Sequence, residues 1–336
     1  MTGDCDSGCR VVGHADNVKI VFADGAPFGS ARCDAGNVSP EADVNRVPPE
    51  SGFVSAWSAH LGPEYARLRD VVAAAFPPSR YASLELAVRL DTVAQLERML
   101  ARTGRTADLV TDLLFRVHTG TLMTLLGAAA SQADTFARWA TSCWAMTSDD
   151  LSGDEHARHA YNMVAYWYEC QRLVADAHTI ERDSLIGDLV RGQNATRAIS
   201  DHEIASMCYG LLYLGHKAMT QSVANGLRAL IGDHDRWQEL VADPATIPTA
   251  LEALPAPGWV RGDDFRASGD EYPGVNLGIP AGVCNSLTQL HTRIAVEEIV
   301  LAVPHLRLVV PAPAEPGNSH RASTPLSLWV TRVESG

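Results

Sequence analysis

Seven cysteines give this chain its widest choice of chemistry, because a thiolate can ligate a metal, attack an electrophile or form a disulfide. They stand at positions 5, 9, 33, 143, 170, 208 and 284, with no repeated pair spacing. Cys5 and Cys9 lack a second pair at the spacing that zinc sites use. We therefore predict free thiols in a reducing compartment and no structural metal site.

Histidines and hydroxyl groups give no stronger signal. His156 and His159 lie three residues apart and would be neighbours on a helix, but no third metal ligand accompanies them, so solvated surface histidines are predicted. The chain has neither the Gly-x-Ser-x-Gly turn of hydrolases nor a Walker-type phosphate loop. A hydrolase or phosphate-transfer activity is therefore not indicated.

Composition limits the partners. The chain has 336 residues, 46% of them hydrophobic, and a formal net charge of −13, which disfavours nucleic acids and anionic membranes because both are bound by clustered Lys and Arg. No apolar stretch reaches the roughly 18–20 residues of a membrane span. Residues 1–10 lack the apolar stretch of a secretory signal, so a cytoplasmic location is expected.

The apolar spacing predicts a mainly helical protein. Residues 1–50 form an irregular segment with a short strand or helix, 51–311 a helical domain, and 312–336 a C-terminal tail with a short strand. Short extended pieces are predicted at 306–310 and 326–332. The predicted helices are 54–75, 81–102, 105–127, 132–147, 153–177, 180–193, 200–231, 234–242 and 285–302.

The longest predicted helix has clear ends. Ser200 and Glu203 have the spacing of a capping box, in which each side chain satisfies a free backbone amide of the first turn. Ile204, Met207 and Leu211 then recur on one face, and Gly232 provides a stop.

Several ordered strings resemble the bacterial cytochrome P-450 family of haem-thiolate monooxygenases. None is specific alone, but together they cover about residues 10–310 in the family's order. The strings are GPEYARLR at 62–69 with AFPP at 75–78, LLYLGHKA at 211–218, ADPATIP at 242–248, and the helix from 294 with VPHLRL at 303–308. The resemblance implies a truncated P-450-like fold with a long central helix and a small residual β component.

The resemblance also implies where the chemistry of the family should lie, and the iron ligand is missing there. That chemistry needs a cysteine thiolate on the haem iron. Counting back from the last helix puts Gly282 at the position of this cysteine, and Cys284 lies two residues further on. The alternative of a displaced ligand, Cys284, stays open at this point.

Other family positions are changed as well. The acid and alcohol that deliver protons are replaced by Lys217 and Ala218, and the Glu-x-x-Arg pair would fall at Ala253 and Ala256. Tyr65 stands in place of the histidine that reaches a haem propionate, although Arg69 is kept at the companion position. The short interval from Ala256 to Gly282 also leaves little chain for the strands and the meander that precede the iron loop.

The pattern of losses resembles a haem-free branch of the superfamily whose members activate a nucleotide-deoxysugar glycosyltransferase in actinobacterial antibiotic pathways. This resemblance implies a non-catalytic auxiliary protein with no cofactor and with a glycosyltransferase as its partner, in macrolide, anthracycline or similar biosynthesis. The alternative is a diverged monooxygenase that uses Cys284. Aromatic residues are frequent at the centres of interfaces, so Tyr161, Tyr166, Trp167 and Tyr168 are the candidate partner contacts, with ordinary core packing as the competing interpretation.

Overall fold

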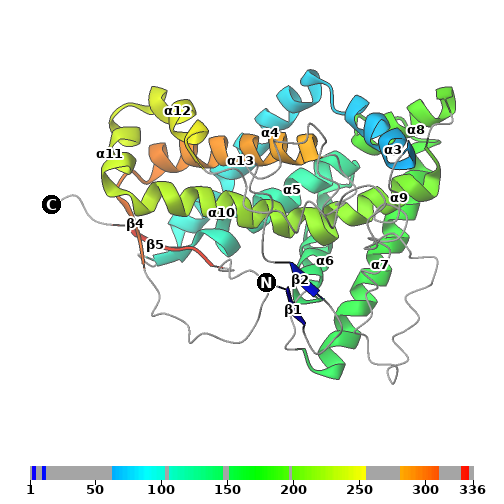
Figure 1. The fold of residues 1–336 in the computed structure, drawn as a ribbon, viewed down its shortest axis with the longest axis horizontal. Helices are drawn as coiled ribbons and strands as arrows, with labels where there is room; N and C mark the ends of the chain where they lie inside the picture. Colours follow the sequence, from blue (N-terminus) through cyan, green and yellow to red (C-terminus); the bar gives the residue numbers. More distant parts are fainter. Residues whose placement is uncertain are drawn as a thin grey trace.

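The computed structural model describes residues 2–4, 10–12, 63–102, 106–146, 151–196, 199–254, 281–309 and 327–332. Within these residues the protein is mainly helical (Figure 1). The helices are α3 (Pro63–Ala74), α4 (Pro78–Ala101), α5 (Phe115–Leu126), α6 (Ala133–Met146), α7 (Gly153–Ala177), α8 (Leu185–Thr196), α9 (Asp201–Gly210), α10 (Lys217–Gly232), α11 (His234–Ala242), α12 (Ile247–Glu252) and α13 (Ala281–Ala302). Single-turn segments are η4 (Val110–Leu114), η5 (Ala130–Gln132), η6 (Leu211–His216) and η7 (Pro244–Thr246).

Most predicted helices are confirmed because their signals are local. Helices α7 and α11 have the predicted bounds. Ser152 and Glu155 form a capping box at the start of α7, as Ser200 and Glu203 do at the start of α9. The part of the first predicted helix that precedes Pro63 lies outside the described residues.

The long central helix differs from the prediction in its middle. Helices α9 and α10 are joined by η6, a π-helical segment, so the backbone stays helical from Asp201 to Gly232 but is locally wider (Figure 1). Such π turns are rare and are frequent at functional sites. Apolar spacing could not predict this π turn. The turn is accompanied by contacts with other helices, since the His216 side chain of η6 bonds to groups on α5 and α6.

The predicted helix 105–127 is wrong at its start. Residues Thr106–Asp108 form strand β3, which pairs antiparallel with β5 (Trp329–Arg332), and β5 also pairs antiparallel with β4 (Leu306–Leu308). The Asp108 carboxylate accepts hydrogen bonds from the amides of Val110 (3.1 Å) and Leu328 (2.7 Å). The strand thus depends on a distant segment that no local pattern reveals. A second antiparallel pair, β1 (Thr2–Asp4) with β2 (Arg10–Val12), lies in the N-terminal segment.

Two smaller differences concern the C-terminal third. Residues 244–252, which lie outside the predicted helices, form η7 and α12, and Asp243 caps η7 by accepting from the amide of Ala245. Helix α13 begins at Ala281, four residues before the predicted start.

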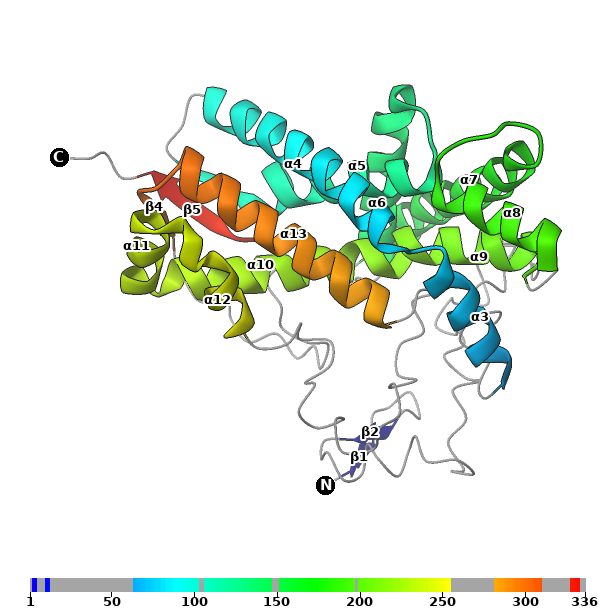
Figure 2. The ribbon, with the colours of Figure 1, turned by 90° about the horizontal axis from the view of Figure 1, so that it is seen from above.

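One part of the core lies where α4, α5, α10 and α13 pack together, and the core continues between α6, α7, α8 and α9. Figure 2 shows α13 lying beside α4 and α10, segments that are far apart in sequence. Gly120 lets α4 and α5 approach closely, since a Cβ atom there would stand 2.5 Å from the Asp91 carboxylate. At the C-terminal end of α5, Gly127 ends the helix with a φ of 68°, a conformation that glycine adopts without strain.

Candidate functional site

The π-helical segment η6 is the centre of the candidate site. Its last residue, His216, is fully buried, and its ring lies against Phe115 and Trp144 with ring centroids 4.9 and 5.6 Å away. Trp144 Nε1 donates a hydrogen bond to His216 Nδ1 over 3.1 Å. The side chain of His216 therefore points into the helical core.

These contacts define the protonation state of His216. Because Trp144 donates to Nδ1, the neutral ring carries its proton on Nε2. That nitrogen lies 3.1 Å from the Phe115 carbonyl and 3.1 Å from Thr119 Oγ1, and both accept from it. Burial lowers the pKa of His216 to about 4, although the Phe115 carbonyl acts in the opposite direction. The imidazole is thus neutral near pH 7.

Two further histidines lie beside this group. His118 of α5 and His291 of α13 are buried, with ring centroids 4.6 Å apart, and His118 is 6.1 Å from His216. Burial lowers the pKa of His118 well below its usual value and that of His291 to about 3. The sequence alone does not reveal this cluster. Its only sequence signal is a histidine at a core-facing position of each helix.

The replaced positions of the oxygen-binding helix follow η6 directly. Lys217 is half-buried and is the first residue of α10, and Ala218 is the second. A lysine amine carries the opposite charge to a carboxylate, and alanine has no hydroxyl, so this turn offers no acid-alcohol pair for proton delivery. The side chain of Ala218 lies outside the described residues.

The remaining family positions lie on other elements. Ala253 is exposed just after α12, so the Glu-x-x-Arg position begins where this helix has ended, and Ala256 lies outside the described residues. Gly282 and Cys284 lie in the first turn of α13, and Tyr65 and Arg69 lie in α3. For these last four, the structure describes the backbone alone.

The aromatic residues of α7 fall into two groups. Tyr161 and Tyr168, two turns apart, are 76% and 57% exposed. Tyr166 and Trp167 are buried, and Tyr166 donates a hydrogen bond to the Cys208 carbonyl over 2.7 Å. The expectation that Tyr166 and Trp167 contact a partner is therefore wrong, because helical spacing turns them toward α9.

The histidines of α7 do not come together as metal ligands. His159 Nδ1 lies 3.0 Å from Ser142 Oγ on α6. Among the described residues, no group of three His, Cys, Asp or Glu side chains is arranged to hold a metal ion. The described cysteines, Cys143, Cys170 and Cys208, are buried, and burial raises the pKa of each thiol.

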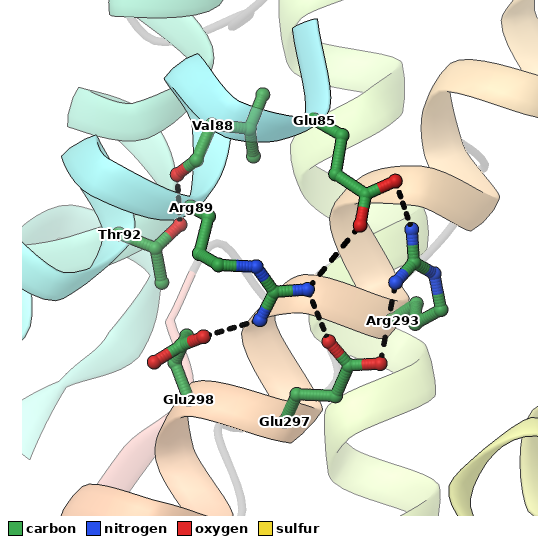
Figure 3. A network of polar contacts seen from close by, with 7 residues as sticks. All are labelled: Glu85, Val88, Arg89, Thr92, Arg293, Glu297 and Glu298. Carbon is green, nitrogen blue, oxygen red and sulfur yellow. Dashed lines mark hydrogen bonds and ion pairs between the residues drawn. The ribbon is translucent and has the colours of Figure 1, made fainter. Parts of the chain in front are cut away.

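An ion-pair network joins α4 to α13 on the other side of the core (Figure 3). Arg89 on α4 binds Glu297 at 2.6 Å, and also binds Glu298 and Glu85. Arg293 on α13 binds Glu85 at 2.8 Å and Glu297 at 3.3 Å. These five charged side chains are called the α4–α13 network below. Hydrogen bonding to Arg293 is the largest effect that lowers the pKa of Glu85.

Comparison with known proteins gives the family. No family model matches the chain. The structure of the cytochrome P450 CREJ in complex with (4-ethylphenyl) dihydrogen phosphate is 32% identical, with a TM-score of 0.76, over 99% of this chain and 94% of that one. The chain therefore belongs to the cytochrome P450 family.

Other relatives support the same fold. The erythromycin C-12 hydroxylase of Saccharopolyspora erythraea is 28% identical over 248 residues, which is 73% of this chain and 58% of the hydroxylase. The mycinamicin IV hydroxylase/epoxidase of Micromonospora griseorubida is 27% identical over 192 residues, 57% of this chain and 47% of that enzyme. The matched part thus spans about half the length of these curated relatives. The open form of cytochrome P450 EryK from S. erythraea has a TM-score of 0.70 at 23% identity, over 98% of this chain and 92% of that one.

Two of the family's positions lack the groups that a haem-thiolate centre uses. Glycine at 282 has no side-chain donor, and the described cysteines are neutral thiols in the core. Lys217 provides no carboxylate beside the oxygen-binding turn. No step of haem chemistry follows from these side chains.

None of the described helices combines the length and apolar character that crossing a membrane requires.

Proposed function

We propose that this protein is a non-catalytic auxiliary protein of antibiotic biosynthesis, which works without haem and binds and stabilises a nucleotide-deoxysugar glycosyltransferase. One observation carries the proposal. The turn after η6, where the family places its acid and alcohol, holds Lys217 and Ala218 on an otherwise complete long helix. The scaffold is kept while the groups that deliver protons are replaced.

The loss at the iron position supports the same function. A thiolate ligand is what distinguishes this haem chemistry, and Gly282 removes it at the expected position. Ala253 and Ala256 remove both partners of the buried ion pair together, which avoids an unpaired buried charge. Such a set of replacements is consistent with a fold that has lost the cofactor and kept its packing.

The relatives suggest the biosynthetic setting. Two of them are named for the hydroxylation of erythromycin and mycinamicin. A protein derived from such a hydroxylase would already belong to an antibiotic pathway. Binding to the competent conformation of a glycosyltransferase would raise the population of that conformation, by no more than the difference in affinity between its two states.

The first experiment separates this function from its alternative, a monooxygenase that uses Cys284. The full chain is purified from cells supplied with a haem precursor, and its iron content and reduced carbon monoxide spectrum are measured. We expect substoichiometric iron and no thiolate-haem band. Stoichiometric haem with such a band would establish the alternative.

The second experiment tests the partner. The protein is mixed with the glycosyltransferase whose gene lies nearest to its own, and co-elution and turnover are measured. We expect a stable complex and a higher rate of glycosyl transfer than for the transferase alone. Equal rates with separate elution would disprove the proposed function.

A further inference from the structure

Three helices bring His118, His216 and His291 to one point of the core, from positions far apart in the sequence. The His118 and His291 rings meet nearly edge to face, at an interplanar angle of 75° and a centroid distance of 4.6 Å. His216 has hydrogen-bond partners for both of its nitrogens. Among the described residues, the other two histidines have no partner for Nε2.

The hydrogen bonds of Thr220 determine the tautomer of His118. The Thr220 hydroxyl donates to the His216 carbonyl over 2.7 Å, so its oxygen accepts the proton of His118 Nδ1, also over 2.7 Å. Nε2 of His118 therefore carries an unprotonated lone pair. This nitrogen and His291 Nε2 are buried and have no hydrogen-bond partner within the described part of the chain. A buried polar atom without a partner is uncommon in native proteins and needs an explanation.

The charges around the pair do not favour a proton there at neutral pH. Besides burial, a positive charge on His291 or His216 would repel a proton on His118, and a positive charge on His216 would repel a proton on His291. Of the elements packed nearby, α10 begins with Lys217, and α4 places Asp91 against Gly120 on α5. On α4 and α13, Glu85, Arg89, Arg293, Glu297 and Glu298 bind one another in the α4–α13 network. On α11 and α12, which also pack on α13, the titratable side chains are His234, Asp235, Arg236, Glu239 and Glu252.

We propose that His118 and His291 form a buried proton-binding pair that loosens helix α13 from the core in mildly acidic solution. A proton on His118 Nε2 or on His291 creates an imidazolium inside an apolar core, and such a charge is costly unless it is paired. The cost is relieved when α13 moves away and water reaches both rings. The pair therefore makes the packing of α13 depend on pH.

The α4–α13 network separates this effect from general acid unfolding. Hydrogen bonding to Arg293 lowers the pKa of Glu85 in this network below the ordinary glutamate value of 4.5. An exposed histidine titrates near pH 6.5, which is the value for the opened helix. Between pH 6.5 and 4.5, protonation of the two histidines weakens the packing of α13 while Glu85 stays ionised and bound to Arg293.

Hydrogen exchange of the full chain tests the proposal. Protection factors are measured at pH 7.5 and 5.5 for amides of α13 and, as an internal reference, for amides of α7 that exchange by local opening and not by global unfolding. Each histidine that is neutral in the core and charged in the open state changes the opening equilibrium about tenfold per pH unit. We therefore expect the protection of α13 to fall about 10- to 100-fold more than that of α7.

Variants assign the effect to the pair. His118→Phe combined with His291→Leu should remove the difference between α13 and α7, whereas His234→Gln, at the exposed start of α11, should leave it unchanged. If the double variant does not fold, His291→Gln keeps a polar group without a titrating one and should reduce the difference about tenfold. Equal acid dependence of α13 and α7 in the wild type, or an unchanged difference in the pair variants, would overturn the proposal.

Discussion

The indole nitrogen of Trp144 donates its proton to Nδ1 of His216 over 3.1 Å, which joins α6 to the π-helical segment of the long helix. This bond selects the Nε2-protonated tautomer, which then donates to Phe115 on α5. Three elements are thus held by one imidazole ring. The widened turn of the long helix is positioned by side-chain contacts as well as by backbone bonds.

Replacing Trp144 by Phe should destabilise the protein. The change keeps an aromatic ring but leaves His216 Nδ1 as a buried acceptor without its donor, which costs about 1–3 kcal/mol in the free energy of unfolding. Urea unfolding followed by circular dichroism measures it. Trp329→Phe, at a partly exposed strand position, is the control and should change this free energy much less. Equal effects of the two substitutions would contradict a structural role for the Trp144 bond.

The buried histidines should make the whole protein sensitive to acid. Their pKa values are lowered in the folded state, to about 4 for His216 and about 3 for His291, so the unfolded chain takes up protons first. Stability is therefore complete above pH 6.5 and falls as the pH drops toward the folded values. Each histidine contributes a slope of about 1.4 kcal/mol per pH unit, or about 4 for His118, His216 and His291 together.

The measurement for acid sensitivity is a series of urea unfolding curves between pH 7.5 and 5. His305→Gln, at an exposed position after α13, should give a slope close to that of the wild type. A free energy of unfolding that stays constant over this range would show that the three rings are not neutral in the folded protein.

Removing Arg89 should weaken the contact of α4 with α13. Arg89→Gln leaves Glu297 and Glu298 close together with less positive charge between them. These side chains are partly exposed, so solvent screening limits the expected loss to about 1 kcal/mol. Thermal unfolding at low and high salt measures it, and high salt should reduce the difference from the wild type. Arg138→Gln, on the exposed face of α6, should show neither effect.

Partner binding should depend on the exposed tyrosines of α7. Under the proposed function, replacing both Tyr161 and Tyr168 by Ala should weaken the glycosyltransferase complex about tenfold or more, because exposed aromatic side chains are frequent at the centres of interfaces. Calorimetry of the purified pair measures the Kd. Leu86→Ala with Leu90→Ala removes a similarly exposed apolar pair on α4 and should leave the Kd unchanged. Equal losses in both variants would mean that α7 is not the specific contact.

Cys284 should be dispensable for partner activation. Cys284→Ala should leave both stability and the rate of glycosyl transfer unchanged if the protein works without an iron ligand. Cys208→Ala is the contrasting variant, because it empties space in the core and should lower the free energy of unfolding by about 1 kcal/mol. A loss of activation in Cys284→Ala with normal folding would show a role for this thiol.

The sequence predicted most of the helices because their signals lie within a few residues of each other. The capping boxes of α7 and α9 and the apolar spacing that follows them are local, and the structure contains both helices. Strand β3 was missed because its partner β5 is more than 200 residues away in the chain. A three-residue strand has too little pattern of its own to be distinguished from the start of a helix.

The candidate site was only partly predictable. The replacements at Lys217 and Ala218 are visible once the strings around them are compared with the family. The histidine cluster is not, because His118, His216 and His291 lie on three elements that are far apart in the sequence and meet only when α5, η6 and α13 pack together. Burial also decides which aromatic residues of α7 can contact a partner. Tyr161 is exposed and Tyr166 is buried, although both lie on the same helix.

The order of the small sheet has a consequence for biosynthesis of the chain. Strand β5 lies between β3 and β4 but is the last of the three to leave the ribosome. Until it emerges, β3 and β4 have no neighbour in this sheet, and the Asp108 carboxylate lacks the Leu328 amide. The helices that precede β5 can therefore assemble during translation, whereas this sheet forms only after β5 has left the ribosome.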